Sequence, residues 1–287
     1  MSQSATTAGV RALMQDFSLE MTGKDVEALR EAAPLIPQGS RVNVTFLGNE
    51  DLQMRVTAAK AVKDLGFIPV PHISARRIHS EDELREFLQA LADVDAAQHV
   101  FAVGGDPAEP LGPYGSSLEM LQSGVFPEFG VKDVSIAGYP EGHPDISEEV
   151  LSRELSGKVD YLAEHDMSAV ILTQFGFDTA PVAKWLNELA AKNISAPVRI
   201  GTPGPAGIRR LLNYAKRFGV GTSAGIVKKY GFSLTNLMGS AGPDKFLQDL
   251  AAETETTNFT GTVGVHFYTF GGMAKTAEWA QDFTKKF

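Results

Sequence analysis

The feature that most constrains the fold is an alternation, repeated along the 287 residues, of short strand-like runs with amphipathic segments. The amphipathic segments carry apolar residues at i, i+3, i+4 and i+7, the spacing of one helix face. Eight runs are predicted strands, at residues 17–22, 41–47, 68–74, 99–105, 133–140, 168–175, 197–203 and 262–270. Predicted helices cover residues 24–35, 50–65, 80–94, 147–164, 180–192, 206–218 and 273–287. Serine followed by acids at Ser80 and Ser147 predicts capped helix starts.

Strands that alternate with helices pair in parallel through right-handed crossovers, so the pattern predicts an α/β protein. Eight such units in a chain of this length favour one closed (β/α)8 TIM barrel over an open sheet. The length also allows two domains of ~150 residues each, but no linker or internal repeat interrupts the chain. We therefore predict a single domain over residues 1–287, with extra helices and a loop at residues 219–260, between strands seven and eight.

The charge of the chain limits its partners. There are 26 basic and 35 acidic side chains, which gives a net charge of −9. Nucleic acids and anionic membranes attract proteins through basic fields, so we expect neither as a partner. The first residues lack the regions of a secretory signal, and no apolar run reaches the ~20 residues that cross a bilayer. We expect a cytoplasmic protein.

Several kinds of site are excluded by residue type. The chain has no cysteine, which removes disulfides, thiolate metal ligands and cysteine nucleophiles. Its six histidines show no metal-ligand spacing, so we expect no metal ion. The sequence also contains no phosphate-binding P-loop and no G-x-S-x-G nucleophile elbow.

Polar side chains mark the carboxyl ends of the predicted strands, where a barrel enzyme places its active site. They are Glu20, Thr45, His72, Asp106, Tyr139, Gln174, Thr202 and Tyr268. Buried strands are expected to stay apolar up to the rim, so polar groups there need water, partners or a ligand. The alternative is that strand ends simply adjoin polar loops.

Two acidic residues in this set have distinctive surroundings. Glu20 interrupts the apolar run FSLEM, and a carboxyl with apolar walls has a raised pKa and can serve as a general acid. The alternative is a glutamate paired with a cation across the barrel. In VGGDP, Gly104 and Gly105 precede Asp106 and allow the backbone to approach a flat ligand closely. A tight turn built from the same residues is the alternative.

The segment YPEGHP at 139–144 is a proline-flanked loop that contains Tyr139 and His143. Such a rigid loop can present a stacking surface to an aromatic cofactor. The alternative is that His143, like His72 in PVPHIS, is only hydrogen-bonded within the fold.

These segments, in this order, resemble the catalytic barrel of the methylenetetrahydrofolate reductase family. The similar segments are FSLEMT, VTFLG, VPHIS, VGGDP, SIAGYPEGHP, LTQFGFD and HFYTF, which lie between residues 17 and 272. The resemblance implies an oxidoreductase of one-carbon metabolism and methionine biosynthesis. It would reduce 5,10-methylenetetrahydrofolate to 5-methyltetrahydrofolate with NADH or NADPH, through bound FAD, and it could form a homo-oligomer.

The resemblance also implies roles for individual residues. Glu20 would protonate N10 of the folate, and Asp106 would stabilise the positive charge that develops on the pterin. The tetrahydrofolate substrate would contact Asp106, Gln174 and Tyr268. Cofactor contacts would come from Thr45, His72, Gly105, Asp106, Tyr139, His143, Lys158 and Gln174.

The chain departs from the family where FAD is held. Gly104 replaces an arginine, and on the following helix Leu151, Glu154 and Gly157 replace FAD ligands, so that Lys158 alone matches. Each charge-assisted hydrogen bond is worth about 1.5–3 kcal/mol, so these changes predict weak FAD binding, another FAD pose, or direct hydride transfer from NAD(P)H. Gly272 replaces an arginine that meets the folate glutamate tail.

Two other functions fit the same residues. One is a folate-binding or regulatory barrel without turnover, and the other is a folate-dependent methyltransferase. Glu20 favours an enzyme over a binder, because a protein that only binds folate needs no acid at N10.

Overall fold

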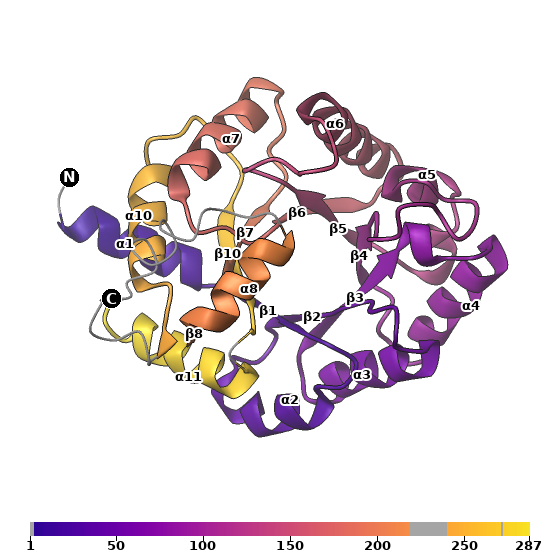
Figure 1. Ribbon diagram of the computed structural model, residues 1–287, viewed down its shortest axis with the longest axis horizontal. Helices are drawn as coiled ribbons and strands as arrows, with labels where there is room; N and C mark the ends of the chain where they lie inside the picture. The colour runs from indigo at the N-terminus through magenta and orange to yellow at the C-terminus, as the bar shows by residue number, and fades with distance from the viewer. Residues whose placement is uncertain (1–2, 219–239, 271) are drawn as a thin grey trace.

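The computed structural model describes residues 3–218, 240–270 and 272–287. Eight parallel strands close into a barrel in the order β1-β10-β7-β6-β5-β4-β3-β2, which confirms the predicted α/β barrel (Figure 1). The barrel strands are β1 (Ser18–Met21), β2 (Arg41–Val44), β3 (Ile68–Ser74), β4 (His99–Val103), β5 (Asp133–Gly138), β6 (Ser168–Thr173), β7 (Val198–Pro203) and β10 (Val263–Tyr268). All eight lie within the predicted ranges.

Helices surround this barrel (Figure 1). They are α1 (Gln3–Met14), α2 (Val26–Ala32), α3 (Leu52–Asp64), α4 (Glu81–Ala92), α5 (Ser117–Gln122), α6 (Glu148–Glu164), α7 (Thr179–Ala191), α8 (Ile208–Phe218), α10 (Asp244–Thr254) and α11 (Met273–Thr284). Short 3-10 turns occupy η1 (Ala33–Leu35), η2 (Ala75–Arg77) and η3 (Phe126–Phe129). Within the described ranges, no helix is both long and apolar enough to span a membrane.

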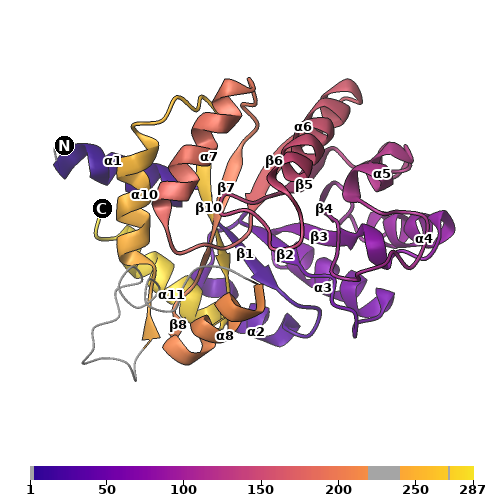
Figure 2. The ribbon, with the colours of Figure 1, turned by 45° about the horizontal axis from the view of Figure 1, so that its top comes forward.

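The insertion between the seventh and eighth barrel strands is confirmed in part. Both α8 and α10 lie between β7 and β10, and the small antiparallel pair β8 (Ala206–Gly207) and β9 (Ser240–Ala241) joins the two sides of the insertion. Helix α10 lies beside α1 and α7 (Figure 2). Residues 219–239, which belong to the predicted extra segment, are outside the described residues.

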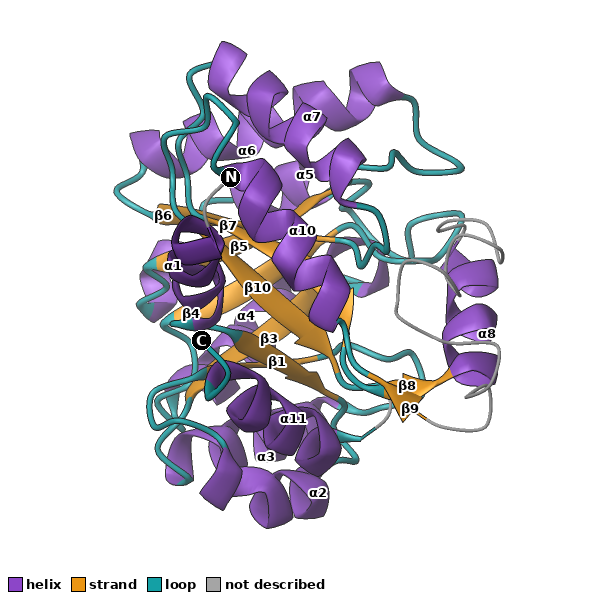
Figure 3. Ribbon diagram, turned by 90° about the vertical axis from the view of Figure 1, so that its left-hand side faces the viewer, coloured by secondary structure: helices purple, strands orange, loops and turns teal. Residues whose placement is uncertain are grey.

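Two helices were missed by the sequence patterns. Helix α5 has only six residues, which is too short for a helical period to show. Helix α1 begins with the polar and small residues QSATTAG, and among its described side chains the buried apolar ones are Val10, Leu13 and Met14. It lies at the amino-terminal end of the barrel, opposite the ends to which the strand arrows point (Figure 3).

The predicted helix starts are capped by their serines. The hydroxyl of Ser80 accepts the amide of Glu83 at 3.1 Å, and that of Ser147 accepts the amide of Val150 at 3.4 Å. The carboxylate of Glu83 accepts the amide of His79 at 2.6 Å. In a capping box Glu83 would accept the main-chain amide of Ser80, the N-cap residue. Here it accepts the amide of the residue before it.

The interior of the barrel is filled by its own apolar cluster. Val70, Phe101 and Leu172 are buried there and are packed by Val103 and Ala137. The closed sheet therefore has a packed core rather than a pore, as in other barrels of this size. Polar groups directed inward near the strand ends lie above this cluster, which leaves the carboxyl end of the barrel for a site.

Candidate functional site

A cavity of about 280 Å³ opens at the carboxyl ends of the strands. Its volume is near the lower limit of the ~300–1,000 Å³ usual for small-molecule sites. The described residues that line it are Glu20, Thr45, Phe46, Leu47, His72, Phe101, Val103, Ala137, Tyr139, Leu172, Gln174, Phe175, Tyr268 and Phe270. Most of these side chains are aromatic or aliphatic, and none is a lysine or an arginine. The cavity thus suits a flat ligand that offers few charges to its walls.

Glu20 supplies the carboxylate of this cavity from the end of β1. Its side chain is 16% exposed, and its Oε2 lies 3.7 Å from Nε2 of His72 and 3.6 Å from Nε2 of His266. No lysine or arginine in the described ranges forms an ion pair with it. The hydroxyl of Thr269 donates to the main-chain oxygen of Glu20 at 2.6 Å and holds this strand end in place. The alternative of a lysine or arginine partner across the barrel is not seen among the described residues, where two imidazoles face Glu20 instead.

His72, on β3, is uncharged near neutral pH. Burial lowers its pKa from 6.5 to about 4, against the opposing effect of Glu20, and His266 lowers it further. Its Nε2 lies 3.3 Å from Nδ2 of Asn43, and its ring meets the edge of Phe101 at 4.6 Å. As assigned, the amide of Asn43 donates to Nε2, which leaves the imidazole unable to donate from that atom to Glu20.

His266, on β10, belongs to the site but was not among the predicted site residues. It is fully buried, its Nδ1 lies 2.8 Å from the hydroxyl of Ser18, and its Nε2 is directed at Glu20 without a hydrogen-bond partner. The signal that could have revealed it is the two-residue period of a strand. Ser18 precedes Glu20 by two positions, and His266 precedes Tyr268 by two, so each pair lies on the same face of its strand.

Two tyrosines form part of the cavity wall. The hydroxyl of Tyr268 donates to the main-chain oxygen of Thr173 at 3.1 Å. Burial raises the pKa of Tyr268 well above 10, with further contributions from Glu20 and Tyr139. Burial alone raises the pKa of Tyr139. Both phenols therefore remain neutral. The hydroxyl hydrogen of Tyr268 is already donated to Thr173, so this phenol can only accept a hydrogen bond from a ligand, whereas that of Tyr139 can also donate one.

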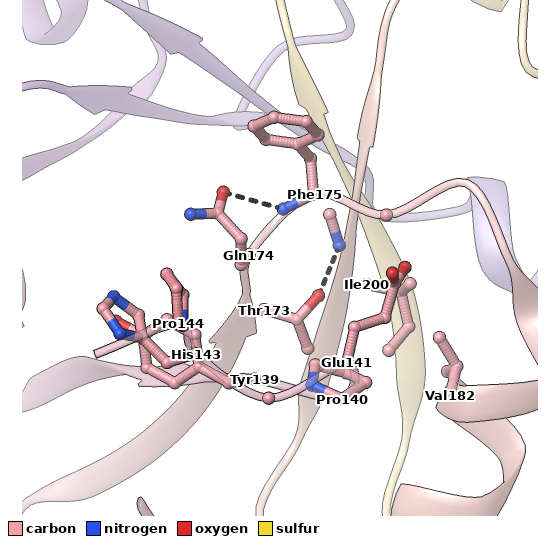
Figure 4. Close-up of a pocket in the computed structure, with 13 residues that line it drawn as sticks. Tyr139, Pro140, Glu141, His143, Pro144, Thr173, Gln174, Phe175, Val182 and Ile200 are labelled. Atoms are coloured by element: carbon pink, nitrogen blue, oxygen red, sulfur yellow. Dashed lines mark hydrogen bonds between the residues drawn. The ribbon is translucent and has the colours of Figure 1, made fainter. Parts of the chain in front are cut away.

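Gln174 and the 139–144 loop lie together beside the main cavity (Figure 4). The Oε1 of Gln174 accepts its neighbour's amide, that of Phe175, at 3.0 Å, and its amide nitrogen is directed away from that bond (Figure 4). In the loop, the ring of Tyr139 meets the edge of His143 at 5.3 Å, and Nδ1 of His143 accepts the amide of Asp145 at 3.1 Å. The structure brings Gln174 and Tyr139 into the cavity, while His143 lies in the adjoining hollow.

Thr45 also reaches the cavity, at the end of β2. Its main-chain amide donates to the oxygen of Met21 at 2.9 Å, whereas its hydroxyl is buried without a hydrogen-bond partner. A buried hydroxyl without a partner costs free energy, so a ligand that hydrogen-bonds it would recover that cost.

Asp106 is not brought together with Glu20. Its side chain is 76% exposed and forms an ion pair with Arg77, with Nε at 2.8 Å and Nη2 at 2.6 Å from Oδ1. Gly105 has a φ of +98°, and a Cβ built there would lie 2.2 Å from the hydroxyl of Ser74, so this position needs glycine. Asp106 and Gly105 thus belong to a rim loop, and neither lines the cavity.

Lys158 lies in a different part of the molecule, between α5 and α6. It is 7% exposed, and its ammonium donates to the hydroxyl of Ser117 at 3.1 Å. Burial lowers its pKa, with Glu154 opposing this effect. The helices pack closely here, because a Cβ on Gly157 would lie 3.0 Å from Leu118. Lys158 does not line the cavity.

A metal centre finds no support in the part of the chain that the structure describes. No group of three histidine, aspartate or glutamate side chains there is arranged to hold a metal ion.

Comparison with known proteins gives similarity of architecture alone. No family model matches the sequence. Among solved structures, the chain is similar to triosephosphate isomerase from Bartonella henselae, with 10% identity, coverage of 94% of this chain and 99% of that one, and a TM-score of 0.49. It is also similar to dihydropteroate synthase from Thermus thermophilus, with 14% identity, 95% and 94% coverage, and a TM-score of 0.48. A thermostable aldo-keto reductase shares 15% identity, with 93% and 89% coverage and a TM-score of 0.47.

Proposed function

We propose that this protein reduces 5,10-methylenetetrahydrofolate to 5-methyltetrahydrofolate with NADH or NADPH, at the cavity that contains Glu20. The observation that carries the proposal is the state of this carboxyl group. It lies in an aromatic-walled cavity, 16% exposed, with imidazoles in place of a lysine or arginine partner. The geometry places this carboxyl group where a flat ligand in the cavity would meet it, which is the position that a general acid needs.

The walls of the cavity fit the substrate class. A pterin is flat, and the rings of Tyr139, Phe175 and Tyr268 offer it apolar surfaces. The amide nitrogen of Gln174 and the hydroxyl of Thr45 offer it hydrogen bonds. Because few polar groups face the cavity, each of them fixes the orientation of the ring.

The reaction then needs one proton and one hydride. Glu20 donates its proton to N10 as the bond from N10 to the methylene carbon breaks, which leaves an iminium between that carbon and N5. The hydride from C4 of the nicotinamide adds to the methylene carbon, yielding the N5-methyl group and NAD(P)⁺. Glu20 is left ionised and regains its proton from water. Holding nicotinamide and iminium in contact is the main contribution that the cavity makes to the second step.

The residues present do not fit FAD as the resemblance would place it. The described lining contains no lysine or arginine, Lys158 is bonded to Ser117 between two helices, and Gly104 has no side chain to offer. A pyrophosphate without cations or donors is poorly bound. We therefore propose that the hydride passes directly from NAD(P)H to the folate, without a flavin.

The test is turnover by the purified protein without added flavin. We expect loss of NADH or NADPH absorbance that depends on methylenetetrahydrofolate, no visible flavin band after gel filtration, and no acceleration by added FAD. A flavin band in stoichiometric amount that survives gel filtration would overturn the direct route. Tight folate binding without nucleotide oxidation would instead indicate a binding protein. Methyl transfer to an added acceptor would indicate a methyltransferase.

A further inference from the structure

Arg55 is a buried guanidinium that the proposed reaction does not use. It lies in the first turn of α3, where the N-cap residue Asp51 accepts the amide of Met54 at 2.7 Å. Arg55 is 7% exposed, and its Nε and Nη1 have no hydrogen-bond partner. Burial of an unpaired charge costs free energy, so another interaction has to offset that cost.

No carboxylate of the described residues forms an ion pair with Arg55. Glu50, which precedes α3, is also buried, but its carboxylate oxygens accept the main-chain amides of Gly23 at 2.9 Å and Leu47 at 3.4 Å. Burial lowers the pKa of Arg55, and the charge of Glu50 opposes this effect. A guanidinium nevertheless stays charged at neutral pH, so the partner of Arg55 has to be sought among uncharged groups.

The guanidinium lies against two aromatic rings. Its Cζ is 3.5 Å from the centroid of the Phe46 ring and 5.4 Å from that of Phe87. The two rings meet edge to face, with their centroids 6.0 Å apart. A cation over an aromatic face is attracted by the quadrupole of the ring, and the attraction is stronger where water is excluded. Phe46 is therefore the main partner of Arg55.

Phe46 links this contact to the cavity. It follows β2 in the loop that leads to α3, and it lines the cavity that contains Glu20. Arg55 does not line the cavity, so its guanidinium lies on the side of the ring that faces away from a ligand. Phe46 is only partly buried, and a phenyl ring has no hydrogen-bonding group to fix its orientation. The guanidinium behind the ring and Phe87 beside it supply that restraint.

We propose that Arg55 is a positioning residue that holds the ring of Phe46 as a wall of the cavity and thereby sets the affinity for the folate. This inference rests on the proposed function. A flat ligand gains most from a ring that is already oriented, because ordering a free side chain costs free energy on binding. Arg55 does not reach the cavity, so its loss should weaken binding and leave proton transfer from Glu20 unchanged.

The experiment compares the wild type with Arg55→Met, which keeps a long side chain without its charge. In calorimetric titration with 5-methyltetrahydrofolate, Kd should rise about five- to tenfold, the factor expected for a desolvated cation–π contact. KM for methylenetetrahydrofolate should rise by the same factor, whereas kcat should change by less than about twofold, because only binding is affected. Arg55→Lys keeps a cation over the ring and should recover most of the affinity.

Phe46→Leu decides whether Arg55 acts through the ring. On its own it should weaken binding, and in its presence Arg55→Met should have no further effect on Kd, because residues in contact have non-additive effects. The matched control is Arg199→Met, which removes a buried guanidinium at the amino-terminal end of the barrel. This control should lower the temperature of unfolding and leave Kd and KM unchanged.

A wild-type Kd in Arg55→Met overturns the inference, and so does an equal loss of affinity with and without the ring of Phe46. An Arg55→Lys variant as weak as Arg55→Met overturns the role of the charge. If Arg55→Met does not fold, a wild-type Kd in Phe46→Leu overturns the inference instead. Failure of the wild type to bind 5-methyltetrahydrofolate overturns the proposed function itself. The contact is then still tested by thermal unfolding, where purely additive shifts in Arg55→Met and Phe46→Leu would contradict it.

Discussion

Charged groups have different partners at the amino-terminal end of the barrel and in the cavity that contains Glu20. At the amino-terminal end, the buried guanidinium of Arg199 donates to Asp16, which also pairs with Arg41 at 3.0 Å. At the carboxyl end, Glu20 has only imidazoles within 4 Å among the described titratable groups. A charge paired with an opposite charge is stabilised in its ionised form, and Glu20 has no such lysine or arginine partner among the described residues. We expect the ion pairs at the amino-terminal end to contribute to stability, and we propose that the reaction takes place at Glu20.

The pKa directions follow the same division. At the amino-terminal end, His99, whose Nδ1 lies 3.0 Å from Oδ2 of Asp133, lowers the pKa of that carboxyl, against the opposing effect of burial. At the carboxyl end, burial is the largest cause and keeps both His72 and Tyr268 uncharged. Burial is also the largest cause at Arg199, where it lowers the pKa, but there the charge of Asp16 opposes it.

The largest effect is expected from Glu20→Gln, which keeps the shape of the side chain but cannot release a proton. Loss of a general acid should lower kcat by about 10²- to 10⁴-fold, measured as NAD(P)H oxidation with methylenetetrahydrofolate. Asp133→Asn, at the opposite end, is the control and should keep its activity. Full activity in Glu20→Gln would show that Glu20 is not the acid and would break the comparison.

The next effect concerns stability at acid pH. His72 has a pKa of about 4 when folded and 6.5 as its ordinary value, so the unfolded chain binds more protons between these pH values. The stability that the protein has with His72 buried and uncharged is therefore fully present above pH 6.5. It is lost as the pH falls towards 4, and the free energy of unfolding falls by up to about 3 kcal/mol, since each pH unit is worth 1.36 kcal/mol. In urea unfolding, the free energy of unfolding of His72→Gln should fall less steeply between pH 6.5 and pH 4 than that of the wild type. The control is His79→Gln, at an exposed histidine, which should leave the pH dependence of the free energy of unfolding unchanged. An equal pH dependence in the wild type and in His72→Gln would contradict the argument that burial lowers the pKa of His72.

At the amino-terminal end, Asp16→Ala removes the carboxylate that faces buried Arg199. The free energy of unfolding at neutral pH should fall by about 1–3 kcal/mol, because a buried charged donor loses its partner. Turnover should be unchanged. Asp64→Ala breaks an exposed pair with Lys60 and should cost less than ~1 kcal/mol. A large loss of activity in Asp16→Ala would show that the two ends are coupled.

The smallest effect is expected from Ser18→Ala, which removes the hydroxyl bonded to Nδ1 of His266. Loss of one buried hydrogen bond should lower stability by about 1 kcal/mol. The pH dependence of kcat should also move, because Ser18 orients the imidazole that faces Glu20. Ser123→Ala, which loses a hydroxyl bond to Met120 outside the barrel, is the control and should leave that profile in place. An unchanged pH dependence of kcat in Ser18→Ala would show that the orientation of His266 does not affect Glu20.

The fold could be predicted because its signal is local. Strands and helices alternate with their own periods, and each predicted strand contains the observed one. Glu20 could also be identified as a candidate from the sequence, since a carboxyl within FSLEM is conspicuous beside its apolar sequence neighbours. Tyr139, Gln174 and Thr45 followed from their places at strand ends, and the closed sheet brings them to one cavity.

Tertiary structure alone decided which of these groups meet. Ser18 and His266 are 248 positions apart, and only closure of the barrel between β1 and β10 brings them together beneath Glu20. Asp106 pairs with Arg77, and Lys158 donates to Ser117. No local sequence pattern indicates either of these contacts, which hold both side chains away from the cavity. By itself the sequence indicated the barrel and singled out Glu20 as a candidate, because periodicity and residue type are properties of short segments. Partners, burial and charge state depend on contacts between distant segments, and those exist only in the folded chain.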